Sequence, residues 1–246
     1  MVLYTQGVVL RQIRTIRNRR IIALFSRDYG KISAGTFINE SGKNKSALAL
    51  RPFALGRYEL AKSRGQYYIN GTEVLQSHYR IGASVEKYMY ASYALEFTDK
   101  LLQEDEPAQA LFDELIEFLS LMEDRKKAYG TLALGYVCRA IAWAGCAPDL
   151  DSCIACGEKE TRVLSVEDGG LLCHACCDKR AGNAGLLFAV DEDIIRVFKY
   201  LLNNPLKNLE TLVLREDLEH KLKEMLNTYI ACHLGVGTLK SESLIV

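Results

Sequence analysis

The sequence predicts an α+β protein with more than one domain: a five-stranded barrel, then an all-α body that carries a metal-binding insertion. Three observations lead to this fold class. Short β-like segments fill the first eighty residues, helical periodicity begins near Ser84, and four cysteines form two close pairs in the middle of the chain. We expect the barrel within residues 1–80, the helical domain within residues 81–246 and the insertion at about residues 148–188.

The N-terminal segment contains five expected strands separated by turn-forming residues. Gly30 and the pair Asn70-Gly71 are expected turns, and residues 39–46 are polar and glycine-containing, as in a loop. Five short strands at this spacing, with no helical period between them, predict a small closed barrel of the oligonucleotide-binding (OB) fold. The expected strands are residues 3–12, 21–25, 31–38, 53–60 and 66–75.

From Ser84 onward apolar residues recur at three- and four-residue steps, which is typical of helices. Pro107, preceded by two acidic residues, is expected to start the second helix. The third is apolar on nearly all sides and is expected at the centre of the helical domain, ending near Gly145. The expected helices span residues 84–103, 107–122, 126–144, 191–202 and 215–234, and the tail at residues 235–240 is expected to be loose.

The cysteines follow the pattern C-x2-C-x16-C-x2-C, which is the spacing of a four-thiolate zinc site. A complete set of four protein ligands leaves no open position, so such a zinc would be structural. A redox dithiol and two disulfides are the alternatives, and His174 or Cys177 could replace a neighbouring ligand. Gly157 is expected at positive φ. The predicted ligands are Cys153, Cys156, Cys173 and Cys176, while Cys138, Cys146 and Cys232 are expected in the core.

Positive charge is concentrated at the start of the chain, although the net charge of the whole is zero. Residues 1–80 contain 14 Lys and Arg against 4 Asp and Glu, a balance of +10, and the rest carries −10. This asymmetry predicts a module that binds nucleic acid, against the alternative of a solvated basic face. The candidate DNA contacts are Arg11, Arg14, Arg17, Arg19, Arg20, Lys31, Lys43, Lys45 and Arg57.

Single-strand binders combine such charges with aromatic side chains on which bases stack. Tyr29, Phe37, Tyr67 and Tyr68 are available in the barrel segment, but each one taken singly is more simply a core residue.

Several function classes are not supported. The N-terminus lacks a signal-peptide pattern, and no stretch of 18 apolar residues is present, so we expect an intracellular, reducing location and no membrane contact. Neither a Gly-x4-Gly-Lys phosphate loop nor the His-x-Glu of zinc deaminases occurs. The four histidines form no pattern with a nucleophile, and we expect no enzymatic activity.

The order of these parts resembles the RecO family of bacterial recombination mediators. The matching segments are residues 7–10, 25–33 and 52–53, and later residues 147–157 and 169–176, of which Ala147-Pro148-Asp149-Leu150 before the cysteines is the most specific. Where family members commonly have an acidic residue in the first loop, this chain has Thr15-Ile16-Arg17.

The resemblance implies a DNA repair protein that binds single- and double-stranded DNA and anneals complementary strands. It further implies action with RecR to load RecA onto DNA coated by single-stranded DNA-binding protein, RecF as a further partner, and a cytoplasmic, nucleoid-associated location. Two other hypotheses stay open at this point: a zinc-ribbon protein that binds RNA or ribosomes, and an interaction scaffold whose acidic helical body carries the function.

Overall fold

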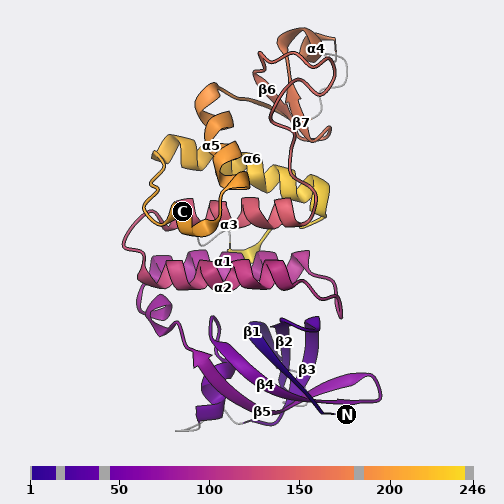
Figure 1. Cartoon of the computed structure of the whole chain (residues 1–246), viewed down its shortest axis with the longest axis vertical. Coiled ribbons are helices and arrows are strands. Elements are labelled where there is room, and N and C mark those ends of the chain that lie inside the picture. The colour runs from indigo at the N-terminus through magenta and orange to yellow at the C-terminus, as the bar shows by residue number, and fades with distance from the viewer. Residues whose placement is uncertain (1, 15–19, 39–44, 180–185, 242–246) are drawn as a thin grey trace. The chain divides into compact units, whose positions relative to one another are not determined.

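The computed structural model describes residues 2–14, 20–38, 45–179 and 186–241 (Figure 1). The chain forms two compact units. One unit is Met1–Tyr129 together with Leu239–Val246, and the other is Gly130–Thr238.

The first unit begins with a closed five-stranded barrel, drawn in indigo and purple in Figure 1. The strands follow the order β1-β2-β3-β5-β4, and β4 pairs with β1 to close the sheet. β3 and β5 are parallel, while all other neighbours are antiparallel. The predicted OB-fold barrel is therefore confirmed. Its strands are β1 (Val2–Arg14), β2 (Arg20–Ser26), β3 (Gly30–Thr36), β4 (Leu55–Ser63) and β5 (Gln66–Gln76), with a short 3-10 helix η1 (Lys45–Leu50) before β4.

Alternate residues of these strands point inward, as the period of two requires. The inward-facing side chains form one apolar core in which Tyr58 is completely buried and donates a hydrogen bond to the Ala49 carbonyl. The core includes Leu3, Val9, Ile22, Leu24, Ile32, Ala34, Leu60, Tyr67 and Ile69.

The expected turn at Asn70-Gly71 is wrong, because β5 continues through it. Gly71 lies opposite Glu59 and Ile69 lies opposite Leu60, so Asn70 has no partner residue on β4 and forms a β-bulge. Bulges increase strand twist, which closing a small barrel requires. The chain reverses instead at Arg64 and Gly65, both at positive φ.

Two helices of the first unit follow a second 3-10 helix, η2 (Tyr79–Ala83): α1 (Val85–Leu101) and α2 (Gln109–Asp124). Ser84, expected as the first helical residue, caps α1 instead by accepting a hydrogen bond from the Lys87 amide. Phe112 of α2 packs edge-on against Phe25 of β2, with ring centroids 5.2 Å apart, so α2 covers part of the outer barrel wall.

The prediction that Pro107 starts α2 is wrong, since the helix begins at Gln109. The residues before it are held against the barrel: the Asp105 amide donates to the Lys31 carbonyl at 2.8 Å. Gly30, at φ 70°, leaves the space that the Glu106 backbone occupies. These contacts keep the connection extended for two residues beyond the expected start.

In the second unit, α3 (Tyr129–Trp143) is buried along nearly its whole length, as predicted. Thr131 donates a hydrogen bond to the Glu219 carboxylate at 2.6 Å, and the absence of a side chain at Gly135 lets Leu209 approach α3 closely. The other elements around α3 are α5 (Glu192–Asn203), η3 (Leu206–Leu209) and α6 (Glu216–Leu234). Within the described ranges, no helix is both long and apolar enough to cross a membrane.

The insertion between α3 and α5 contains a three-stranded sheet in the order β7-β6-β8. Its elements are β6 (Val163–Ser165), β7 (Gly170–Leu172), α4 (His174–Asp178) and β8 (Leu187–Ala189). His233 of α6 donates through Nε2 to the Val166 carbonyl at 2.5 Å and stacks on Tyr229. These contacts hold the β6–β7 turn against α6.

Two smaller expectations are also wrong. Cys232 is exposed and Cys146 is only half-buried, so Cys138 alone of those three lies in the core. The tail is not loose either, because Leu239 is buried and the Ser241 amide and hydroxyl donate to the Glu96 carboxylate at 2.8 and 2.6 Å.

Candidate nucleic-acid interface and metal centre

The four predicted cysteines come together at one end of the small sheet. Their sulfur atoms all lie within 4.8 Å of one another, and the sulfurs of Cys156 and Cys173 are 3.6 Å apart. A tetrahedral zinc with Zn–S bonds of about 2.3 Å would set its sulfurs about 3.8 Å apart. The arrangement therefore fits a single four-coordinate metal ion with no open coordination position.

Backbone hydrogen bonds shape the first cysteine pair. Gly157 has φ 80°, as predicted, and its amide donates to the Cys153 carbonyl at 2.7 Å. The Ile154 amide donates to the Leu171 carbonyl at 2.9 Å, which holds this turn beside β7 and so beside the second pair. The donor set is thus assembled by main-chain geometry.

The protonation of the sulfurs favours a cation at their centre. Burial alone would raise the pKa of Cys153, but backbone amides of Cys173, Ala155 and Cys156 point at its sulfur and lower the pKa to about 6. A backbone hydrogen bond from Glu158 lowers the pKa of Cys156, but Cys153 and Cys173 raise it more in sum, and Cys156 and Cys173 also raise the pKa of Cys176. A cation at the centre of the cluster would stabilise the thiolates of all four residues together.

His174 and Cys177 lie beside the second pair but outside this group of four. The Nδ1 atom of His174 lies 2.8 Å from the Asp178 carboxylate, and the imidazole is largely exposed. The Cys177 amide donates to the Cys173 carbonyl, as expected in the first turn of α4.

The basic residues predicted to contact DNA are distributed unevenly. Arg17, Arg19 and Lys43 lie outside the described residues, while Arg14 and Lys45 are described in their backbone only, at the end of β1 and the start of η1. The four others are Arg11, Arg20, Lys31 and Arg57.

Those four cations have partners within the protein. Arg11 and Lys31 both contact Asp99 of α1, and Arg57 pairs with Glu73 at 2.8 Å. Arg20 donates to the Ile38 carbonyl at 2.7 Å and to the Gln12 side chain at 3.1 Å, so it ties the end of β3 to β1. DNA contact by these residues stays a prediction.

Two cations that sequence reasoning missed lie at the β4–β5 hairpin. Arg64 occupies the turn and is exposed, and no acidic group of the described residues lies within ion-pair distance of it. Lys62 is also exposed and donates to the Tyr67 hydroxyl at 2.7 Å, an interaction that raises the pKa of this lysine. The sequence pattern that could have identified them is Lys62 and Arg64 next to Gly65, between two expected strands. The turn was instead expected at Asn70-Gly71, so this hairpin was overlooked.

The candidate aromatic residues differ in exposure. Tyr67 is a core residue, and Tyr29 is half-buried against the same core. Phe37 is 86% exposed just beyond the end of β3, and Tyr68 lies half-exposed on the outer face of β5. The simple core interpretation therefore holds for Tyr67 and fails for Phe37.

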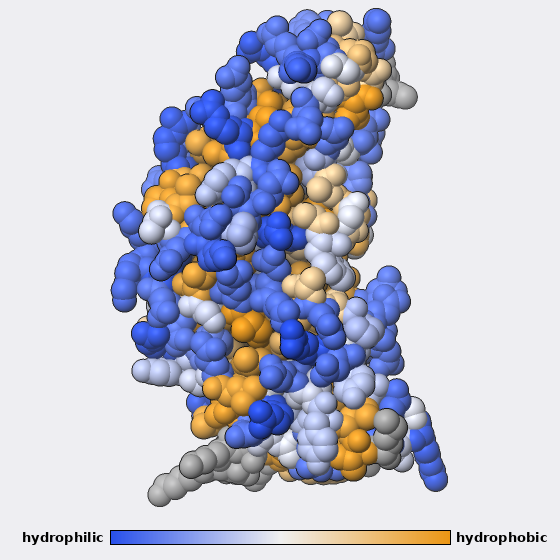
Figure 2. All heavy atoms as spheres, viewed as in Figure 1, coloured by the Kyte–Doolittle hydropathy of each residue, from blue (hydrophilic) through white to orange (hydrophobic). Residues whose placement is uncertain are grey.

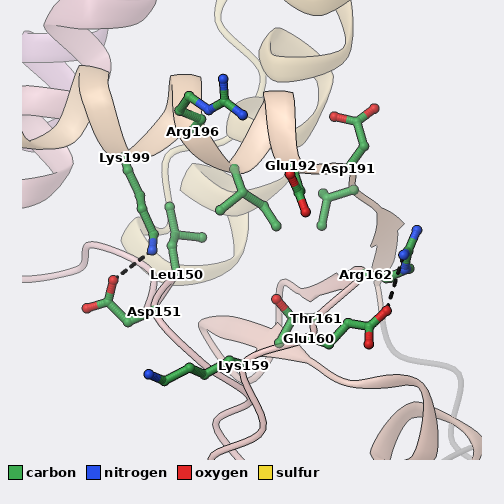
Figure 3. A pocket seen from close by; sticks show the side chains of 12 residues that line it. Leu150, Asp151, Lys159, Glu160, Thr161, Arg162, Asp191, Glu192, Arg196 and Lys199 are labelled. Carbon is green, nitrogen blue, oxygen red and sulfur yellow. Dashed lines mark hydrogen bonds and ion pairs between the residues drawn. The ribbon is translucent and has the colours of Figure 1, made fainter.

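A separate pocket of about 400 Å³ lies in the second unit, between the insertion and α5 (Figure 3). Leu150, Val190 and Ile195 contribute apolar surface to it. Its charged residues partly neutralise one another, since Lys199 pairs with Asp151 at 2.8 Å and Arg162 with Glu160 at 3.2 Å. Because positive and negative side chains of the pocket pair with each other, the pocket is not suited to binding a polyanion such as DNA.

The chain matches two family models that together span most of its length. Residues 1–78 match the N-terminal domain of recombination protein O, and residues 83–243 match its C-terminal domain. Proteins named "DNA repair protein RecO" are similar along nearly the whole chain. The one from Alkaliphilus metalliredigens is 27% identical over 238 residues, covering 95% of this chain and 94% of that protein. The one from Bacillus pumilus is 27% identical over 245 residues, covering 98% and 93%.

Proposed function

The chain belongs to the RecO family of DNA repair proteins, and we propose that it is a recombination mediator that binds DNA through its barrel. The observation that carries the proposal is the match of both RecO domains to a chain whose first eighty residues have a charge balance of +10. In this proposal residues 1–80 form the DNA-binding domain. Residues 81–246 form the helical domain, with the zinc-binding insertion at about residues 148–188.

The binding energy comes mainly from phosphate contacts. Exposed cations near a nucleic-acid strand release its condensed counterions, and this gives affinity for single and double strands without sequence preference. Lys62 and Arg64 are the described cations best placed for this role, because they are exposed on one hairpin of the barrel. Arg17, Arg19 and Lys43, from the segments on either side of β2 and β3, complete the proposed set.

Strand annealing follows from the same electrostatics. Two complementary strands repel each other through their phosphates, and a protein that neutralises both backbones lets the bases meet and pair. The step needs no covalent chemistry, so we propose that the protein is not an enzyme. RecR and single-stranded DNA-binding protein are the proposed partners in loading RecA, with RecF as a further partner, at the nucleoid in the cytoplasm.

The proposed metal is one structural zinc held by Cys153, Cys156, Cys173 and Cys176. Bound zinc would neutralise the thiolates and cross-link the two cysteine pairs, which lie seventeen residues or more apart in the chain. The turn after Cys153 and the start of α4 would then be fixed to each other. This is a folding role within the second unit.

Annealing of two complementary fluorescent oligonucleotides tests the proposal. Replacing Arg17 and Arg19 by Glu is expected to slow protein-promoted annealing at least tenfold, because two attractive phosphate contacts become repulsive. The matched control is Arg162→Glu with Arg215→Glu, which makes the same change of charge at exposed positions outside the barrel. Equal slowing by both double variants would show that only net charge matters and would remove the barrel from the proposal. Comparing a single-stranded RNA of equal length separates a DNA-repair role from an RNA-binding one.

A further inference from the structure

Strand pairing brings one residue from each of the five strands into a single band on the outer barrel surface. Ile13 of β1 lies opposite Ile21 of β2, and Ile21 lies opposite Gly35 of β3. Gly35 lies opposite Tyr68 of β5, which in turn lies opposite Ala61 of β4. None of the five residues is buried. Space-filling atoms also show apolar side chains reaching the surface between hydrophilic ones over the barrel (Figure 2).

The middle of this band holds Tyr68 in a fixed position. A Cβ atom on Gly35 would lie only 3.3 Å from the Tyr68 ring, so the ring rests directly on the glycine backbone. At its other end the Tyr68 hydroxyl donates to the Gln66 side chain at 2.9 Å. An aromatic ring that is held at two points is already ordered. Binding a ligand to its exposed surface therefore costs little further conformational entropy.

Phe37 lies near the same surface. It follows Gly35 by two residues and stands just beyond the end of β3, where its side chain is exposed. Its ring is 86% exposed, the highest fraction among the exposed large apolar side chains of the described residues. Because Phe37 is close in the chain to Gly35, it adds to the exposed apolar surface at this end of β3, and contiguous exposed apolar surface marks binding sites.

Charge indicates the class of that ligand. Lys62 is on β4, whose Ala61 pairs with Tyr68, and Arg64 is at the following turn, so exposed cations border the band. A surface that combines cations with exposed aromatic rings suits an unpaired strand, whose phosphates meet the cations while its bases stack on the rings. Duplex bases are already stacked on each other and cannot use such rings.

We propose that Gly35, Phe37 and Tyr68 form a stacking platform for unpaired bases and that this platform makes the barrel prefer single-stranded over double-stranded DNA. The inference rests on the proposed function, because it assumes that the barrel binds DNA. Phosphate contacts give affinity for both kinds of strand, and the platform adds affinity for unpaired bases only.

The test measures equilibrium binding of the full-length protein to a single-stranded oligothymidine and to a duplex of equal length. Phe37→Ala and Tyr68→Leu are each expected to weaken single-strand binding about tenfold, with duplex binding and the salt dependence of both nearly unchanged. The matched control is Tyr4→Ala, which removes an exposed aromatic ring from β1, two strands away from Tyr68. It should bind like the intact protein.

Fluorescence adds a readout that does not depend on affinity. The chain has one tryptophan, Trp143, so Phe37→Trp adds a single second emitter, and stacking of a base on it should quench the added emission. If the intact protein binds no DNA, both the proposed function and the platform fail. If it binds DNA, but Phe37→Ala binds single strands as tightly and the emission of Phe37→Trp is not quenched, the platform alone is overturned.

Discussion

Arg11 of β1 donates a hydrogen bond from Nε to the Asp99 carboxylate of α1 at 2.5 Å. Lys31 contacts the same residue, with its ammonium 2.6 Å from the Asp99 carbonyl and 3.5 Å from its other carboxylate oxygen. Two of the nine basic residues that the sequence predicts to contact DNA therefore interact with Asp99. This pairing favours a role for Arg11 and Lys31 in holding α1 against the barrel.

The Asp99 contacts predict that Arg11→Gln affects stability more than DNA binding. The arginine is half-exposed, so we expect a loss of about 0.5 kcal/mol in the free energy of unfolding. The slope of log affinity for single-stranded DNA against log salt should stay that of the intact protein. Chemical denaturation and a salt titration measure the two quantities. A clearly flatter slope would place Arg11 among the phosphate contacts.

Gly30 is predicted to be essential for the packing of residues 104–106 on the barrel. Its φ of 70° disfavours any side chain, and an added Cβ would meet the Glu106 carbonyl. Gly30→Ala should lower the free energy of unfolding by about 3 kcal/mol or more. Gly65→Ala is the control, because Gly65 has a similar φ of 78° and no atom within 4 Å of the added Cβ; it should cost about 1 kcal/mol. Equal losses would show that backbone strain alone matters.

The sulfur cluster predicts about one zinc per chain in protein purified under reducing conditions. Cys153→Ser with Cys156→Ser should abolish zinc binding and lower the helical content seen by circular dichroism, since the insertion loses its cross-link. Cys177→Ser should retain the metal, because Cys177 lies outside the group of four sulfurs. Elemental analysis that finds no zinc in the intact protein would contradict this account.

His78 predicts a loss of stability on mild acidification. Its side chain is completely buried, with Nδ1 3.1 Å from the Glu123 carboxylate, and burial lowers the pKa of His78 more than Glu123 and Asp124 raise it. Below about pH 6.5 the unfolded chain therefore binds a proton at this histidine that the folded protein does not bind. From pH 7 to pH 5.5 the folded state should lose up to about 1 kcal/mol through this residue.

Thermal or chemical unfolding across that pH range tests the His78 prediction. His78→Gln should lose less stability than the intact protein between pH 7 and pH 5.5, whatever its stability at neutral pH. Above pH 7.5 the two curves should run parallel, because the histidine is neutral in both states. Identical acid dependence throughout would exclude His78 as the cause. The lowered pKa of Glu123 acts in the same direction but only below about pH 4.5, so its contribution is separable.

Short-range sequence patterns were sufficient to predict the barrel, the order of the helices and the cluster of four cysteine sulfurs. Cys153 and Cys156 are followed by a glycine at positive φ, and the second pair repeats their spacing, so the cluster is encoded within short segments. The buried α3 was equally clear, because a helix that is apolar on nearly all sides has to lie in a core.

Features that depend on strand register could not be predicted. Asn70-Gly71 has the composition of a turn, yet the pairing of β4 with β5 makes it a bulge. Gly35 and Tyr68 are far apart in the chain, and only the parallel pairing of β3 with β5 places one on the other. Likewise, no local signal relates Arg11 to Asp99, so the division of the cations into paired and exposed groups appears only in the folded barrel.

The most direct test of DNA binding by the barrel is the salt dependence of binding to a single-stranded oligonucleotide for the intact protein and for Lys62→Gln with Arg64→Gln. The account predicts a steep negative slope of log affinity against log salt for the intact protein. Each lost phosphate contact should flatten the slope by about 0.7, so the double variant should be flatter by about 1.4. An unchanged slope in the double variant, or a slope near zero in the intact protein, would contradict it.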